Sequence, residues 1–128
     1  MSGVGWQQFR EFGAIDLTRS FVIAWAVENE ALVLDIDLLL LENHPFYETP
    51  RPAEKVCIRP ATIEFPWCYG LEADGLESGS TIEETSGLLK IGRIDDLQLV
   101  TDGQYALSGE FGNVAIRSER PVLRLKGH

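Results

Sequence analysis

Apolar residues recur at every second position along two consecutive segments of this chain, and this period limits the possible fold more than any other feature. Successive side chains of a β-strand point to opposite faces of a sheet, so the spacing predicts two strands that each have an apolar face. Residues 28–30 between the segments are turn-compatible, which predicts a hairpin over residues 21–40. The alternating apolar residues are Phe21, Ile23, Trp25 and Val27 in the first strand and Leu32, Leu34, Ile36, Leu38 and Leu40 in the second.

Most of the remaining chain consists of similar short segments separated by turn residues. Alternation resumes over residues 55–65, where Pro60 indicates a bulge or an edge position. Asp102-Gly103 is a strong hairpin signal, and the flanking segments place Leu97 and Leu99 opposite Tyr105 and Leu107. Further strands are expected over residues 88–101, 105–111, 114–117 and 122–126.

Three segments do not show this period. Trp6, Phe9 and Phe12 are spaced by three, which predicts a short helix or turn whose aromatic side caps one end of the core. Residues 42–52 contain three prolines and are expected to cross the surface as a loop. Residues 66–87 are rich in glycine, serine and acids and should be mostly loop. Ser80 and Glu83 have the spacing of a capping box, which would allow one helical turn after Ser80.

These elements predict one mainly β domain over residues 1–128. We expect an antiparallel sandwich or partly open barrel of about seven strands with a short N-terminal helix. A parallel α/β fold would need helical crossovers of a dozen residues or more, and no amphipathic segment of that length is present.

Composition limits the partners and the compartment. The 128 residues carry a formal net charge of −9, so the field of the protein repels nucleic acid and anionic membranes. The longest apolar stretch is interrupted by Asp35 and Asp37 and is too short to span a bilayer. The first residues do not have the pattern of a signal peptide, so we expect a cytoplasmic protein in which Cys57 and Cys68 are reduced and buried.

Catalytic motifs are missing from the sequence, and we expect a protein that is not an enzyme and holds no cofactor. His44 is the only well-placed imidazole, and no nucleophile elbow, phosphate-binding loop or zinc-ligand spacing accompanies it. The alternative is a metal-dependent enzyme. Its metal ligands would be Asp35, Asp37, Glu42 and His44, although an Asp pair on one strand is more often a solvated face.

Two aromatic clusters are the best candidates for a binding surface. Trp67 and Tyr69 precede an acidic stretch that contains Glu72, Asp74 and Glu77. Tyrosine and tryptophan are enriched in protein interfaces, and acids attract a basic partner, but Trp67 could equally close one end of the core. Phe46 and Tyr47 lie next to His44 in the proline-rich loop, where they could line a pocket or anchor the loop to the sheet.

The sequence therefore favours an acidic protein-binding module with a basic protein partner. In size, charge and β-rich layout the chain resembles the small immunity proteins that neutralise bacterial toxins, a likeness of class that no motif carries. A small-ligand barrel or sandwich is the alternative, with a cavity lined by Phe21, Trp25, Tyr105 and Phe111. Exposed strand edges would favour a homodimer.

Overall fold

The fold is mainly β and antiparallel, as predicted. The computed structural model describes residues 4–50, 52, 56–75 and 81–126. Within these residues the chain forms nine strands, one α-helix and two 3-10 turns. The elements are β1 (Val4–Gly5), η1 (Trp6–Gln8), η2 (Arg10–Phe12), β2 (Ile15–Glu28), β3 (Ala31–Leu40), β4 (Cys57–Phe65), β5 (Gly70–Ala73), α1 (Ile82–Leu88), β6 (Gly92–Thr101), β7 (Gln104–Gly109), β8 (Gly112–Arg117) and β9 (Val122–Leu125).

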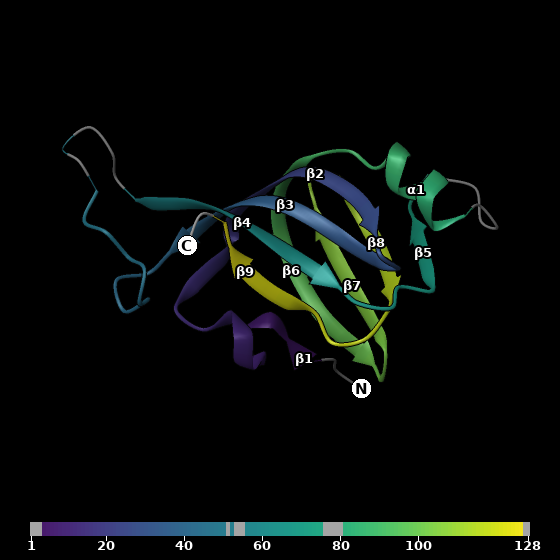
Figure 1. Cartoon of the computed structure of the whole chain (residues 1–128), viewed down its shortest axis with the longest axis horizontal. Helices are drawn as coiled ribbons and strands as arrows, with labels where there is room; N and C mark the ends of the chain where they lie inside the picture. Colours follow the sequence, from purple (N-terminus) through teal and green to yellow (C-terminus); the bar gives the residue numbers. More distant parts are fainter. Residues whose placement is uncertain (1–3, 51, 53–55, 76–80, 127–128) are drawn as a thin grey trace.

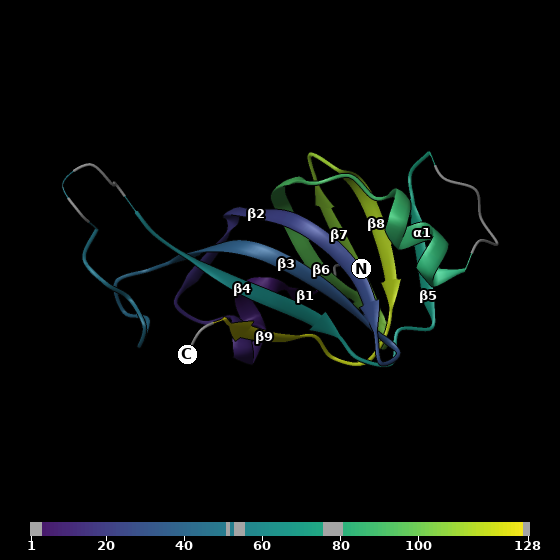
Figure 2. The same cartoon turned by 45° about the horizontal axis from the view of Figure 1, so that its top comes forward.

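The strands form one open sheet that bends back on itself. Their order is β5-β8-β7-β6-β2-β3-β4-β9, and β1 pairs with β6 beside this path. Only two residue pairs, Phe21 with Arg93 and Val22 with Gly92, join β2 to β6. Figures 1 and 2 show β2, β3, β4 and β9 as one layer and β6, β7 and β8 as the other. The arrangement is a partly open structure with two strands more than expected, and it is not a closed barrel.

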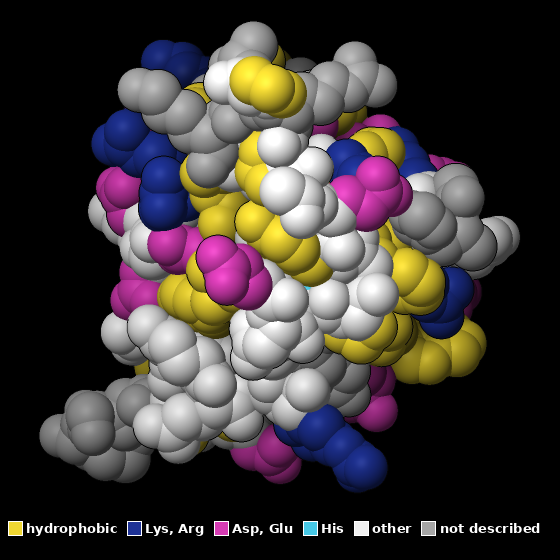
Figure 3. All heavy atoms as spheres, turned by 90° about the vertical axis from the view of Figure 1, so that its left-hand side faces the viewer, with side chains coloured by type: hydrophobic (Ala, Val, Ile, Leu, Met, Phe, Trp, Pro, Cys, Tyr) yellow, Lys and Arg dark blue, Asp and Glu magenta, His cyan; other side chains and the backbone are white. Residues whose placement is uncertain are grey.

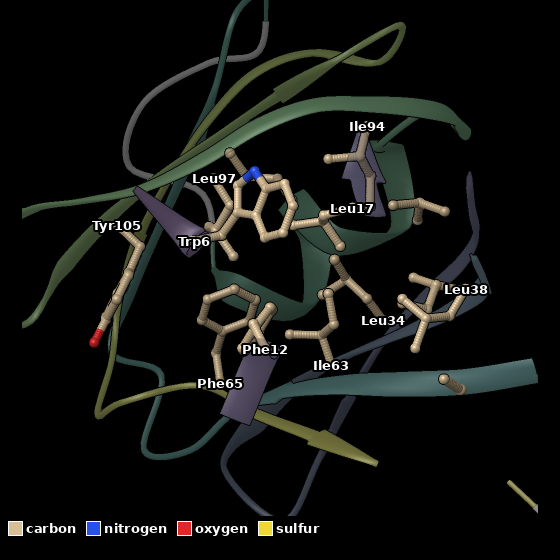
Figure 4. Packing of buried hydrophobic residues seen from close by; sticks show 14 of the residues in the cluster. Trp6, Phe12, Leu17, Leu34, Leu38, Ile63, Phe65, Ile94, Leu97 and Tyr105 are labelled. Atoms are coloured by element: carbon tan, nitrogen blue, oxygen red, sulfur yellow. The ribbon is translucent and has the colours of Figure 1, made fainter. Parts of the chain in front are cut away.

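The hydrophobic core fills the space between the two layers (Figure 4). Leu34 and Ile63 come from one layer and Leu97 from the other, and all three are fully buried. The Phe65 and Tyr105 rings meet across the core with their centroids 5.8 Å apart. At the N-terminus the two 3-10 turns bury Trp6, Phe9 and Phe12, which confirms the predicted aromatic cap.

The prediction that residues 21, 23, 25 and 27 share one buried face is wrong for Phe21 and Ile23 of β2. Phe21 and Ile23 are 44% and 46% exposed, whereas Val22 is buried. The pairing of β2 with β3 shifts register between Val22 and Ala24. A β-bulge of this kind changes which face the following residues occupy, so Trp25 and Val27 pack against the core.

Pro60 does not mark a bulge, but it lies at an edge position of β4, because β9 pairs with β4 only from Ala61 to Glu64. It pairs with Asp37 in an unbroken register, and β4 lies between β3 and β9. The carbonyl of Pro60 accepts from the backbone N–H of Lys126, just beyond the last β4–β9 pair, Ala61 with Leu125. A residue's N and carbonyl point to the same side of a strand, so the nitrogen of Pro60 faces the place where the β9 ladder ends.

Residues 66–91 contain more regular structure than the sequence predicted. β5 extends the sheet at its edge, and α1 begins one residue later than the expected capping box. The N-cap is Thr81, paired with Glu84, whereas Ser80 lies outside the described residues. The segment from Leu88 to Ile91 ends the helix and links it to β6 instead of forming part of a strand.

The connection between β3 and β4 extends away from the body of the molecule, and we call its described residues 41–50, 52 and 56 the arm (Figures 1 and 2). Leu41 and Phe46 are among its exposed apolar residues. Figure 3 looks at the side from which the arm projects, where acidic and polar side chains divide the apolar ones into small areas.

Two further predictions concern the cysteines and the membrane. Cys57 and Cys68 are both buried and neither forms a disulfide, as predicted. Among the described residues, no helix has the length and apolar character needed to cross a lipid bilayer.

Candidate functional site

Four connections between antiparallel strands lie at the end of the sheet opposite to the arm. They follow β2, β4, β6 and β8, and backbone hydrogen bonds link them to one another. Cys68 donates its N–H to the carbonyl of Glu30 at 2.8 Å, and Ser118 donates to the carbonyl of Gly103 at 3.0 Å. Segments distant in the sequence are thus fixed against each other at this end.

The connection from β4 to β5 displays two aromatic side chains on the surface. Trp67 is 63% exposed and Tyr69 is 68% exposed, while Cys68 between them is buried. Three backbone hydrogen bonds hold this segment: Glu119 N–H to Pro66 O at 2.8 Å, Cys68 N–H to Glu30 O at 2.8 Å, and Tyr69 N–H to Arg117 O at 2.9 Å. Both aromatic residues are therefore exposed on a fixed backbone.

Left-handed backbone is concentrated at the same place. Asn29, Glu30 and Trp67 have φ angles of 51°, 64° and 50°. Outside glycine this conformation costs about 1–2 kcal/mol per residue, and it is a true outlier for a bulky side chain. Strain of this kind persists where surrounding contacts enforce it, and it clusters at functional sites.

A groove of about 440 Å³ lies beside these residues, and we call it the Trp67 groove. Among the described residues its lining combines aromatic, aliphatic and acidic side chains and includes no basic residue. The lining residues are Val27, Glu30, Trp67, Cys68, Tyr69, Ile82 and Glu83. Both glutamates are exposed, so the groove presents negative charge next to two aromatic rings.

The start of α1 places Glu83 at this groove. The Thr81 hydroxyl accepts from Glu84 N–H at 3.1 Å, and the Glu84 carboxylate accepts from Thr81 N–H at 3.0 Å. The bond from the Thr81 backbone lowers the pKa of the Glu84 carboxyl. The stabilising effect of this carboxylate is therefore present above its ordinary pKa and is lost as the pH falls through the lowered folded-state value.

Replacing Thr81 with alanine should lower the free energy of unfolding by about 1 kcal/mol. The Thr81 hydroxyl accepts a hydrogen bond from a backbone N–H of the first helical turn, and this N–H has no partner within the helix. Urea unfolding followed by circular dichroism measures the loss. Thr101→Ala is the control, since Thr101 is exposed at a strand end. An equal loss in both variants would contradict a specific effect of the cap.

The other predicted acidic residues lie elsewhere. Glu72 and Asp74 line a separate groove of about 420 Å³ on the outer face of β5, β6, β7 and β8, with Ala106 and Ala115 among its other lining residues. The amide of Asn113 donates to the carboxylate of Asp74 at 2.7 Å. Glu77 lies outside the described residues.

Phe46 and Tyr47 differ in their surroundings. Phe46 is 45% exposed, with its ring centroid 5.9 Å from that of His44, whereas Tyr47 is half-buried against the core. Tyr47 thus anchors the arm. Neither residue lies near Trp67, because the nine residues of β4 separate the arm from the Trp67 groove.

The four candidate metal ligands do not form one site. Asp35 is paired with Lys126, whose Nζ lies 2.8 Å from a carboxylate oxygen. Nδ1 of His44 accepts from the backbone N–H of Phe46 at 3.0 Å. Among the described residues, no group of three His, Cys, Asp or Glu side chains is placed to hold a metal ion.

Cys68 is poorly suited to act as a nucleophile. Burial raises the pKa of its thiol, the Gly70 backbone opposes this only in part, and the thiol stays protonated at neutral pH. The thiol also donates a hydrogen bond to the Gly70 carbonyl at 3.5 Å. His44 cannot activate it, because the length of β4 separates the two residues. Burial also lowers the pKa of His44.

The four residues expected to line an internal cavity do not meet at one place. Phe21 is exposed on the outer face because of the bulge in β2, so its assignment to a cavity was wrong. Trp25 packs edge-on against Phe111 with centroids 5.3 Å apart. Tyr105 packs instead against Phe9 and Phe65.

Sequence reasoning identified the two aromatic residues of the Trp67 groove and missed the rest of its lining. Glu30 appeared only as a turn residue, and Glu83 only as part of a capping pattern. No local sequence pattern marks Val27 or Ile82 as part of a binding site, because each reaches the groove through the packing of α1 beside β2.

Comparisons with known proteins add no function. No protein-family model, curated protein or solved structure matches this chain.

Proposed function

We propose that this protein is an acidic protein-binding module that engages a basic segment of another protein through the Trp67 groove. The observation that carries the proposal is the exposure of Trp67 and Tyr69, on either side of the buried Cys68, on a hydrogen-bonded backbone. Exposed aromatic residues on a fixed backbone lose little conformational entropy when a partner covers them.

Charge supports a basic partner. Glu30 and Glu83 line the groove, and Glu28 is exposed at the end of β2 nearby. The net charge of −9 adds a long-range attraction for cations. Of the residues first considered for binding, Trp67 and Tyr69 form this surface, while Glu72 and Asp74 extend the acidic character of the neighbouring sheet face.

A short peptide rich in lysine and arginine tests the proposal. The expected result is binding that shifts the fluorescence of Trp67 and weakens about tenfold or more between low and physiological ionic strength, because salt screens exposed charges. Isothermal titration measures the affinity, and Trp67→Phe identifies the fluorescent group. Absence of binding, or binding indifferent to salt, would contradict the proposal.

Matched charge variants locate the contact. Glu30→Gln combined with Glu83→Gln should weaken the peptide severalfold, since each carboxylate lines the groove. Glu42→Gln makes the same change in charge in the arm, at the opposite end of the molecule, and should leave the affinity unchanged. Equal losses would show that net charge alone attracts the peptide.

The proposal includes a cytoplasmic location, which the two unpaired cysteines support. It also includes assembly as a homodimer, which the exposed Phe21 and Ile23 on the outer face of β2 support.

A further inference from the structure

The lining of the Trp67 groove identifies the kind of side chain that it fits. Among the described residues it contains two carboxylates, Glu30 and Glu83, and no lysine, arginine or histidine. Val27 and Ile82 add aliphatic surface, and the Trp67 and Tyr69 side chains add aromatic surface. This combination matches a side chain with a long apolar stem and a cationic end.

An arginine side chain uses these features better than a lysine. The guanidinium group is planar and weakly hydrated, so it stacks on an indole and donates paired hydrogen bonds to a carboxylate at the same time. An ammonium group is strongly hydrated and would keep its water in a groove open to solvent. The volume of about 440 Å³ is enough for one such side chain.

The backbone around both carboxylates is fixed. Glu30 occupies a left-handed turn position, and its carbonyl accepts from Cys68 N–H, the residue next to Trp67. Glu83 follows the N-cap Thr81, whose side chain and backbone pair with Glu84. Glu30, Glu83 and Trp67 thus line the groove from backbone segments that hydrogen bonds hold in place.

On the basis of the function proposed above, we propose that the Trp67 groove binds an arginine side chain of the partner. The guanidinium stacks on the Trp67 indole, and the carboxylates of Glu30 and Glu83 accept its hydrogen bonds. Arginine thus serves as the specific anchor, while the remaining positive charges of the partner contribute long-range attraction.

The test compares three lysine-rich peptides that differ at one central residue: arginine, lysine or the neutral analogue citrulline. Titrations are followed through the indole N–H signal of Trp67 in ¹H–¹⁵N spectra, assigned with Trp67→Phe. The arginine peptide should bind about fivefold more tightly than the lysine peptide, and citrulline should give no such gain. Glu83→Gln should remove most of the preference for arginine, and Glu42→Gln should keep it.

The outcomes separate the two proposals. Equal binding of all three peptides would overturn the arginine anchor and leave the basic-partner proposal standing. Absence of binding by every peptide would overturn both. A preference for arginine that survives Glu83→Gln and does not move the Trp67 signal would place the anchor outside this groove and overturn the inference.

Discussion

Replacing Phe65 with alanine is expected to lower the free energy of unfolding by about 3–5 kcal/mol, which is the range for removing a fully buried aromatic ring. Phe65 is fully buried at the end of β4 and pairs with Leu32 of β3. Its ring also contacts Tyr105 of β7, in the opposite layer. The alanine variant therefore loses contacts with both layers and leaves a cavity between them.

Urea unfolding measured by circular dichroism tests this prediction. The control is Ile58→Ala in the same strand, where the side chain is 37% exposed and the loss should be about 1 kcal/mol or less. If Phe65→Ala does not fold, Phe65→Leu keeps most of the volume and should show a smaller loss. A loss for Phe65→Ala no greater than for Ile58→Ala would contradict a core between the layers.

Replacing Trp67 with glycine is expected to separate binding from stability. The affinity for the lysine- and arginine-rich peptide should fall about 30-fold or more, as for a tryptophan at the centre of an interface. The fold should lose no stability and should gain about 1 kcal/mol or less, because the side chain is 63% exposed and glycine adopts a positive φ without strain. Tryptophan at this position is therefore less favourable for stability than glycine, but it places an aromatic ring on the surface.

Trp67→Ala is the matched variant for this prediction. It removes the same ring but keeps a Cβ at the left-handed position, so it should be about 1 kcal/mol less stable than Trp67→Gly while binding equally poorly. Ile91→Ala removes an exposed apolar side chain outside the groove and should not change the affinity. Wild-type affinity in Trp67→Gly would exclude the groove as the binding surface, and equal stability of the glycine and alanine variants would contradict backbone strain.

The β2–β3 hairpin was predictable because its signal is local. Alternation over residues 32–40 corresponds to β3, and the predicted facing of Leu97 with Leu107 is confirmed by the register of β6 and β7. The interior of β2 was not predictable to the same extent. The register with β3 shifts between Asp16 and Phe21 and again between Val22 and Ala24, so Phe21 faces the solvent while Trp25 packs against the core.

The candidate site shows a similar division. The aromatic cluster was visible in the sequence, but the sequence left open whether Trp67 is exposed or closes the core. That outcome depends on three backbone hydrogen bonds. Cys68 donates to the β2–β3 turn, Tyr69 donates to the end of β8, and Glu119 donates to the connection between β4 and β5. No local pattern contains such pairings, since each joins segments distant along the chain.

The sequence alone determined a mainly β, antiparallel fold, because side-chain alternation and turn residues act over a few neighbouring positions. It also determined the negative charge, because charge depends only on composition. The tertiary structure decided which faces are buried, where β2 changes face, and which acids lie beside Trp67. These features depend on packing between strands that are distant in the sequence. The interactions that stabilise them form only when the two layers and α1 come together.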